Sequence, residues 1–201
     1  DYEGQKQDLI RYMRETENQL QILLCELAAY LHNKDMEINV WDRIIAFEGR
    51  MHEFIKAAYD YQDNTFHSHP GYYIDYFEMR LAQLQVLHNL HYEIKKIRKM
   101  PKQALVIADY IMYMADYVVE MNIPDQQIEK LEEISEQMKQ EELPKTREEF
   151  EGRALLYHIL MDLEEFLVYK KRFVNGLDEK KLRIYWKQEM EQKDSANELQ
   201  K

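Results

Sequence analysis

The sequence is poor in the residues that make turns, cross-links and membrane spans. Its 201 residues include one cysteine, four prolines and five glycines. A single cysteine excludes a disulfide framework and any zinc site with several cysteine ligands. The scarcity of glycine and proline disfavours an all-β fold and a glycine-rich dinucleotide loop. No apolar run approaches the roughly 18 residues of a transmembrane helix, so none is predicted in this stretch.

The charge balance is acidic, with 27 Lys and Arg against 38 Asp and Glu and a formal net charge of −11. An acidic chain repels phosphate backbones, so we expect no nucleic acid among its partners. The sequence opens on Asp1 and carries no signal peptide. We therefore expect it to be part of a longer protein.

Apolar residues recur with the helical period along nearly the whole chain. The predicted helices cover about 5–32, 38–61, 71–99, 102–121, 125–140, 147–173 and 178–191. The pattern predicts an all-α fold, an antiparallel multi-helix bundle of six or seven helices. We expect one bundle domain over 1–193 and a disordered tail over 194–201.

The strongest local signal is a capping box at Thr146–Glu149. The threonine hydroxyl of such a motif accepts the amide of the glutamate, whose side chain reaches back toward the helix start. A helix is therefore predicted to begin here, and Asn175-Gly176 is predicted to end it.

Patterns that carry chemistry are weak or absent. No histidine has a glutamate three positions before it, which excludes the Glu-x-x-His pairs of di-iron bundles. The pairs His67/His69 and His88/His91 are incomplete as zinc sites, and we favour a structural role for both. No nucleophile motif, phosphate loop or kinase element is present. We predict no catalytic residue, no metal site and no cofactor, and hence no enzyme.

Tyrosine is abundant, with 15 Tyr against 7 Phe and 2 Trp. Tyr combines an apolar ring with a polar hydroxyl, which suits half-buried seams between helices as well as binding surfaces. The favoured interpretation is that the tyrosines lie at hydrated contacts between helices. The functional interpretation is a partner surface or a pocket for a flat aromatic ligand.

An anionic aromatic ligand would need a cation in that pocket. Arg80 lies on a helical line that runs from Tyr73 to His91, and Arg153 faces roughly the direction of Tyr157. A buried Arg is costly unless it is paired, so a carboxylate of another helix is the expected partner and a ligand carboxylate the alternative. Tyr73, Arg80, His91 and Arg153 are the candidate ligand-binding residues.

Two long stretches carry a resemblance to a known family. They are Tyr72–Leu90 (YYIDYFEMRLAQLQVLHNL) and Leu143–Phe173 (LPKTREEFEGRALLYHILMDLEEFLVYKKRF). Both resemble the C-terminal domain of the putative aromatic acid exporter family of bacteria, and the resemblance extends over about residues 10–175.

The resemblance implies a helical half of a membrane transporter, located on the cytoplasmic side of the cell membrane. Its partners would be the membrane-embedded N-terminal half of the same protein and further copies in a homo-oligomer. Binding of a small aromatic carboxylate would be a regulatory extension of that role. The implied function is a non-enzymatic accessory, regulatory or assembly role. The alternative is an autonomous ligand- or metal-binding bundle that resembles phosphate-uptake regulators.

Overall fold

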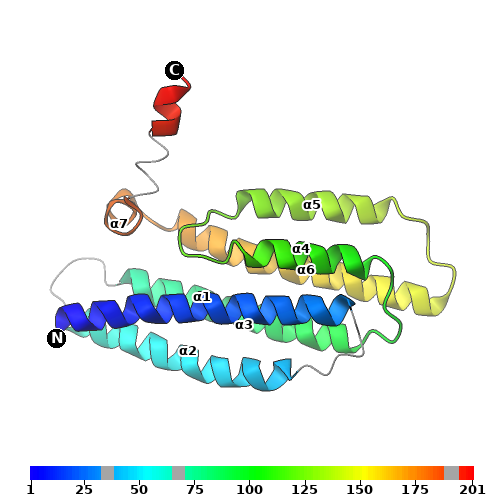
Figure 1. Cartoon of the computed structure of the whole chain (residues 1–201), viewed down its shortest axis with the longest axis horizontal. Helices are drawn as coiled ribbons and strands as arrows, with labels where there is room; N and C mark the ends of the chain where they lie inside the picture. Colours follow the sequence, from blue (N-terminus) through cyan, green and yellow to red (C-terminus); the bar gives the residue numbers. More distant parts are fainter. Residues whose placement is uncertain (33–38, 65–70, 188–194) are drawn as a thin grey trace.

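Four long helices form the body of the molecule in the computed structural model, which describes residues 1–32, 39–64, 71–187 and 195–201. They are α1 (Tyr2–His32), α2 (Val40–Asp63), α3 (Gly71–Lys95) and α6 (Arg147–Asn175). The first three run up, down and up, and α6 packs along α3 (Figure 1). The fold is the predicted all-α bundle.

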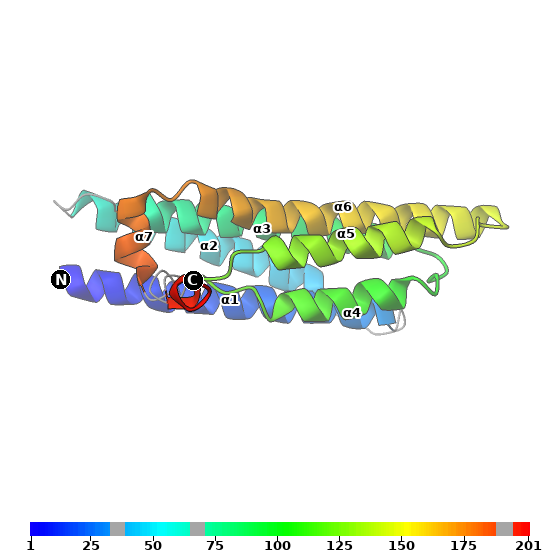
Figure 2. The same cartoon turned by 90° about the horizontal axis from the view of Figure 1, so that it is seen from above.

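Two shorter helices cover one half of this body. α4 (Ala104–Ala115) packs along α1, and α5 (Asp125–Lys139) packs along α6. The last labelled helix, α7 (Glu179–Tyr185), crosses the other half transversely to the long helices (Figure 2). Residues 195–199 are helical and exposed. The predicted boundary at residue 193 lies outside the described residues.

The apolar stripes of the sequence form one continuous core. Leu20, Phe54, Phe77 and Leu84 are completely buried, and their spacing on each helix is the one that the periodicity predicts. The predicted capping box begins α6, because Thr146 Oγ1 accepts the Glu149 amide at 3.1 Å. The Glu149 carboxylate in turn accepts the backbone N–H of Lys145 at 2.8 Å.

The predicted helix 102–121 is too long, because α4 ends at Ala115. Residues 116–124 instead form an irregular connection whose carbonyl groups bond to other helices. Gln21 Nε2 donates to the Val118 carbonyl at 3.1 Å, and Lys170 Nζ donates to the Val119 carbonyl at 2.8 Å. These tertiary bonds satisfy the two carbonyl groups, so the chain can turn here without leaving them unpaired inside the protein. The predicted helix 71–99 likewise ends earlier, at Lys95.

Candidate functional site

A group of charged side chains lies inside the bundle, where apolar residues are the rule. Glu17 on α1, Arg80 on α3, Glu120 in the 116–124 connection and Lys170 on α6 are all at least 95% buried. We call these four residues the interior cluster. Burying a charge is expensive unless it is paired and hydrogen-bonded, so the partners of each member decide what the cluster does.

The two carboxylates of the interior cluster are held together by one guanidinium. Arg14 Nη1 donates to Glu17 Oε1 at 2.7 Å, and Arg14 Nη2 donates to Glu120 Oε1 at 2.9 Å. The backbone N–H of Glu120 also donates to Glu17 Oε1, at 3.1 Å. Since Arg14 is about half exposed, the ion pairs extend from the interior to the surface of α1.

Two buried tyrosines of α3 complete the hydrogen bonding of these carboxylates. Tyr72 Oη donates to Glu120 Oε2 at 2.6 Å, and Tyr76 Oη donates to Glu17 Oε2 at 3.2 Å. Burial raises the pKa of both phenols far above the usual value, and the negative charge of Glu120 or Glu17 adds to the increase. The phenols therefore remain neutral donors at physiological pH.

Arg80 is 1% exposed, which confirms the buried position predicted for it, but its partners differ from the predicted carboxylate. Arg80 Nε donates to Tyr76 Oη at 3.0 Å, and Nη1 donates to Gln83 Oε1 at 2.9 Å. Within the described ranges, Nη2 is buried and has no hydrogen-bond partner. The Arg80 guanidinium therefore bonds to neutral phenol and amide oxygens where a carboxylate was predicted. One of its N–H groups is left without an acceptor.

Lys170 is the second cation of the interior cluster. Its ammonium group donates to the backbone carbonyls of Val119 and Asn122 at 2.8 and 2.9 Å. Burial lowers the pKa of Lys170 well below its usual value, and the positive charge of Arg80 lowers it further. The carboxylates of Glu17 and Glu120 act in the opposite direction. When Arg14 is counted with the interior cluster, the basic residues are Arg14, Arg80 and Lys170 and the acidic residues are Glu17 and Glu120.

The other residues of the predicted line lie elsewhere on the same face of α3. Tyr73 packs edge-on against the rings of Tyr61 and Tyr185, at centroid distances of 5.6 and 5.5 Å. His91 is buried beside Trp41, with ring centroids 6.3 Å apart. Burial lowers the pKa of His91, with a further contribution from Lys95. The ligand-binding role of these residues stays a prediction.

The histidine pairs considered as metal ligands have different outcomes. His88 Nδ1 lies 3.3 Å from Glu48 Oε1, and its ring meets Trp41 edge-on at 4.5 Å. No group of three or more His, Cys, Asp or Glu residues in metal-binding geometry occurs within the described ranges. The pair His67/His69 lies outside the described residues.

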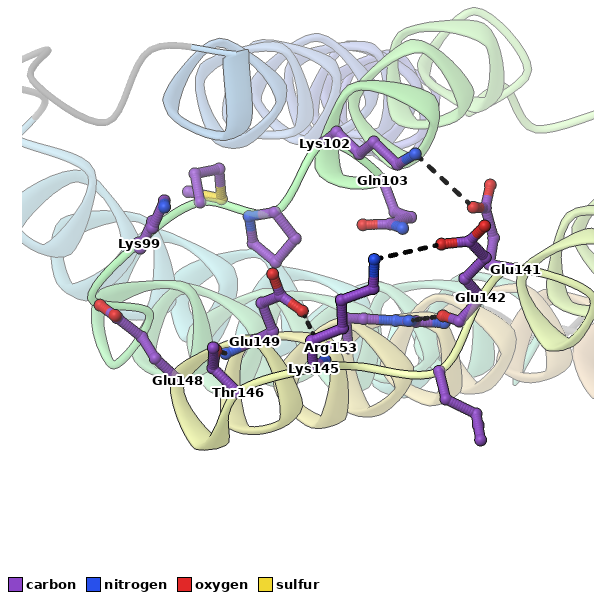
Figure 3. A pocket seen from close by; sticks show the side chains of 13 residues that line it. Lys99, Lys102, Gln103, Glu141, Glu142, Lys145, Thr146, Glu148, Glu149 and Arg153 are labelled. Atoms are coloured by element: carbon purple, nitrogen blue, oxygen red, sulfur yellow. Dashed lines mark hydrogen bonds and ion pairs between the residues drawn. The ribbon is translucent and has the colours of Figure 1, made fainter.

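Arg153, the fourth candidate, lines a pocket of about 390 Å³ at the end of the bundle where α6 begins (Figure 3). Arg153 donates through Nη1 to the Glu142 carbonyl, and its Nε is buried and unpartnered among the described residues. The pocket has both charge signs: Lys102 and Lys145 lie 3.9 and 4.0 Å from Glu141 and Glu142. None of the other three candidates, Tyr73, Arg80 and His91, lines this pocket.

Sequence reasoning missed Glu17, Glu120 and Lys170. Glu17 follows Met13 and precedes Leu20 by helical steps, and Lys170 lies between Phe166 and Phe173 in the same way. A charged residue at a core position of an apolar stripe was thus the available signal for these two. Glu120 gave no such signal, because its position depends on the irregular connection.

Comparisons with known proteins agree with the fold. The curated protein "Uncharacterized protein YqjA" of Bacillus subtilis (strain 168) is 26% identical over 167 residues. The match covers 82% of this chain and 51% of YqjA, so the chain spans about half the length of this relative. A crystal structure of a putative membrane protein from Clostridium difficile 630 has a TM-score of 0.72 at 24% identity, covering 82% of this chain and 98% of that one.

None of the described helices is both long enough and apolar enough to cross a bilayer. A family model described as the putative aromatic acid exporter C-terminal domain matches residues 6–171, which include the interior cluster and exclude α7. The chain therefore belongs to the putative aromatic acid exporter C-terminal domain family.

Proposed function

We propose that this chain is the non-enzymatic, cytoplasmic accessory domain of a membrane exporter, which regulates or assembles the membrane-embedded half. The observation that carries the proposal is the match of residues 6–171 to an exporter C-terminal domain. A relative about twice as long as the matched segment leaves room for a membrane half. The ion pairs and hydrogen bonds of the interior cluster support a binding or structural role over a catalytic one.

The ends of the bundle differ in a way that suits this role. Tyr61 donates to Tyr2 at 3.0 Å, so the start of α1 lies beside the end of α2, at the opposite end from the Arg153 pocket (Figure 2). In the proposal, a preceding membrane half joins the bundle beside Tyr2. The Arg153 pocket then faces away from the membrane.

Exposed apolar side chains on α4 supply a candidate contact for another protomer or for the membrane half. Leu105, Val106 and Met112 are each almost half exposed. Clusters of exposed apolar side chains are typical of interaction surfaces. In the proposal, α4 therefore contributes to assembly.

The regulatory role is tested by deleting the domain from the full-length protein. We expect the remaining membrane half to reach the membrane, with altered export of aromatic acids or altered oligomer size. Both are measured in the same cells, by loss of preloaded acid and by chemical cross-linking. Unchanged export together with an unchanged oligomer would contradict the proposal.

The cytoplasmic location is tested by thiol labelling. Cys25 is the one cysteine of the chain, so Cys25→Ala removes the background of this domain and Leu143→Cys adds a thiol at a position that is 85% exposed; the same protein without Leu143→Cys reports any thiols of the membrane half. We expect a membrane-impermeant maleimide to label this thiol only after the cells are opened. Labelling in intact cells would place the domain on the outer side.

An autonomous ligand-binding bundle is the second candidate function, and the Arg153 pocket is the observation that favours it. Its volume lies within the range of small-molecule sites. The composition of the full-length protein distinguishes the two candidate functions, because an autonomous ligand-binding bundle needs no membrane half. A full-length protein with no membrane-embedded segment would favour this second function.

A further inference from the structure

The exposed side of α4 combines apolar side chains with two carboxylates. Leu105, Val106 and Met112 are each almost half exposed, and Asp109 and Asp116 are exposed among them. Asp116 continues the helical backbone of α4, so the two aspartates are two helical turns apart on the same side of the helix. We call the surface formed by these five residues the α4 face.

The carboxylates of the α4 face have no Lys or Arg partner within the described ranges. Asp109 Oδ1 lies 3.1 Å from Nε2 of His32, which is charged only when it is protonated. Residues 104–116 themselves contain no Lys or Arg. Exposed apolar side chains around unpaired acids fit a partner that is apolar and positively charged. The expected occupant is therefore a basic segment with an apolar residue between its charges.

This chain contains such a segment at α7. Residues 180–187 include four Lys or Arg and no Asp or Glu, although the net charge of the chain is −11. One side of the segment is fixed to the bundle, because Tyr185 stacks on Tyr72 with centroids 3.9 Å apart and Trp186 is 2% exposed. The side chains on the other side are exposed to solvent, and we call them the α7 face: Lys180, Ile184 and Lys187.

The spacing of the α7 face matches that of the α4 face. Its two lysines are seven residues apart, as the two aspartates are. In an antiparallel arrangement, pairing Lys180 with Asp116 aligns the other lysine with Asp109. The same register places Ile184 opposite Met112, so the apolar side chains meet between the two charge pairs. Lysine side chains are long and flexible, so both pairs form without close alignment of the backbones.

The two faces do not meet within one copy, because α4 and α7 lie over opposite halves of the bundle (Figure 2). We propose that the α7 face of one copy docks antiparallel on the α4 face of a second copy. The contact joins two different surfaces, so it is heterologous and each copy supplies one of each. Since α7 lies outside the matched residues 6–171, the family match does not include this contact.

The contact is small and its ion pairs are exposed, so the association is weak. Exposed ion pairs contribute little and are screened by salt. We expect a Kd on the order of 0.1–1 mM at low ionic strength for the chain in solution. Copies held in one membrane would meet at a higher effective concentration.

The role of this contact in assembly rests on the proposed function, because only a membrane half would hold the copies together in this way. All tests below use the 201-residue chain without a membrane. Their failure would leave the accessory role standing. Failure of the deletion experiment would in turn leave the contact between copies standing.

The first test measures self-association by sedimentation equilibrium at low and high salt. Asp109→Lys with Asp116→Lys should weaken association by about tenfold or more, because like charges then face each other. The matched control is Glu129→Lys with Glu136→Lys, which changes the net charge equally. These two positions are exposed and seven residues apart on α5, where no large apolar side chain is exposed. The control should associate at least as well as the unmodified chain.

The second test restores the complementary charges across two variants. Lys180→Glu with Lys187→Glu makes the α7 face acidic, so this variant alone should also associate weakly. When it is mixed with the Asp109→Lys, Asp116→Lys variant, association should return, because an unmodified α7 face then meets an unmodified α4 face. Circular dichroism of each variant checks its fold before mixing. Recovery on mixing itself shows that both variants are folded.

The third test locates the contact by disulfide formation between copies that carry Cys25→Ala. Ile184→Cys and Met112→Cys are placed on separate chains with tags of different size, so that mixed dimers can be identified. They should cross-link several times faster than Ile184→Cys with Leu143→Cys, because only the first pair is brought within disulfide distance. Leu143 is a stringent control, since it is 85% exposed.

Four results would each overturn the proposal. The unmodified chain stays monomeric at about 1 mM in low salt. The α5 variant loses association as strongly as the α4 variant. The mixture of the two charge-reversed variants associates no better than either component. The thiol at position 143 cross-links as fast as the thiol at position 112.

Discussion

Tyr72 and Glu120 share a hydrogen bond of 2.6 Å that joins the start of α3 to the connection between α4 and α5. The same phenol oxygen accepts the indole N–H of Trp186. One hydroxyl group therefore links the interior carboxylates to the segment that follows α7. The interior cluster and Trp186 are parts of one hydrogen-bonded network.

Tyr72→Phe is predicted to lower the free energy of unfolding by about 1–3 kcal/mol, because it leaves a buried carboxylate oxygen without its donor. Urea unfolding at neutral pH measures the loss. Tyr59→Phe is the matched control, since it removes a longer Tyr–Glu bond of 3.4 Å at an exposed site. We expect the control to cost less than about 0.5 kcal/mol. Equal losses would contradict the role given to burial.

The bundle is predicted to lose stability as the pH rises above about 10, the ordinary pKa of tyrosine. Burial raises the pKa of Tyr72, Tyr73, Tyr76 and Tyr110 in the folded chain. Their contribution is complete below the unfolded pKa and decreases as the unfolded chain releases protons that the folded chain retains. Urea midpoints measured across this range test the effect.

Tyr110→Phe removes one of these groups and its bond to the Gln127 carbonyl. The free energy of unfolding of this variant should therefore be lower at neutral pH and should fall less steeply as the pH rises. The difference in slope is up to about 1.4 kcal/mol per pH unit. If the free energy of unfolding falls equally steeply with pH in the variant, Tyr110 does not contribute to the pH dependence.

Lys170 is predicted to give the opposite slope at pH values just below about 10, the ordinary pKa range of lysine. Its folded pKa is lowered, chiefly by burial, so over this range the unfolded chain binds a proton that the folded chain lacks. The free energy of unfolding therefore rises with pH through this group. Lys170→Met should flatten the rise relative to the unmodified chain, as urea unfolding at several pH values can show.

Lys171→Met is the control for this prediction. Lys171 is the next residue of α6, about half exposed, and pairs with Asp125 at 3.4 Å. Its removal should leave the pH dependence of stability unchanged. If both variants flatten the slope equally, burial of Lys170 is not its cause.

Two glycines in helices are predicted to respond differently to alanine. A Cβ atom at Gly49 in α2 would meet nothing within 4 Å, so Gly49→Ala should raise the free energy of unfolding by about 0.5–1 kcal/mol. At Gly152 in α6 the Cβ would lie 3.0 Å from Pro101 Cγ, in a stiff ring. Gly152→Ala should therefore gain nothing or destabilise, as thermal unfolding of both variants can show.

The helices and their core faces could be predicted from the sequence because both depend on local spacing. The burial of Arg80 followed from its place between Phe77 and Leu84 on one helical line. The start of α6 followed from a hydrogen bond between residues three apart, Thr146 and Glu149. Motifs in Tyr72–Leu90 and Leu143–Phe173 also indicated the family to which the chain belongs.

The partners of the buried charges could not be predicted in this way. Arg14 and Glu120 pair across 106 positions, and Tyr72 and Trp186 across 114. The irregular 116–124 connection also depends on distant partners, since Gln21 and Lys170 donate to the carbonyls of Val118 and Val119. Arg80 was expected to meet a carboxylate and instead bonds to Tyr76 and Gln83.

The sequence by itself determined which residues form helices and which face of each helix is buried. Helical periodicity and capping act over a few residues, so they are present in the chain before it folds. Only the tertiary structure decided that Glu17, Glu120 and Lys170 share one interior, and that Trp186 is buried beside Lys170. Those contacts depend on how separate helices dock, and the cost of burying a charge is met only when the distant partner is in place.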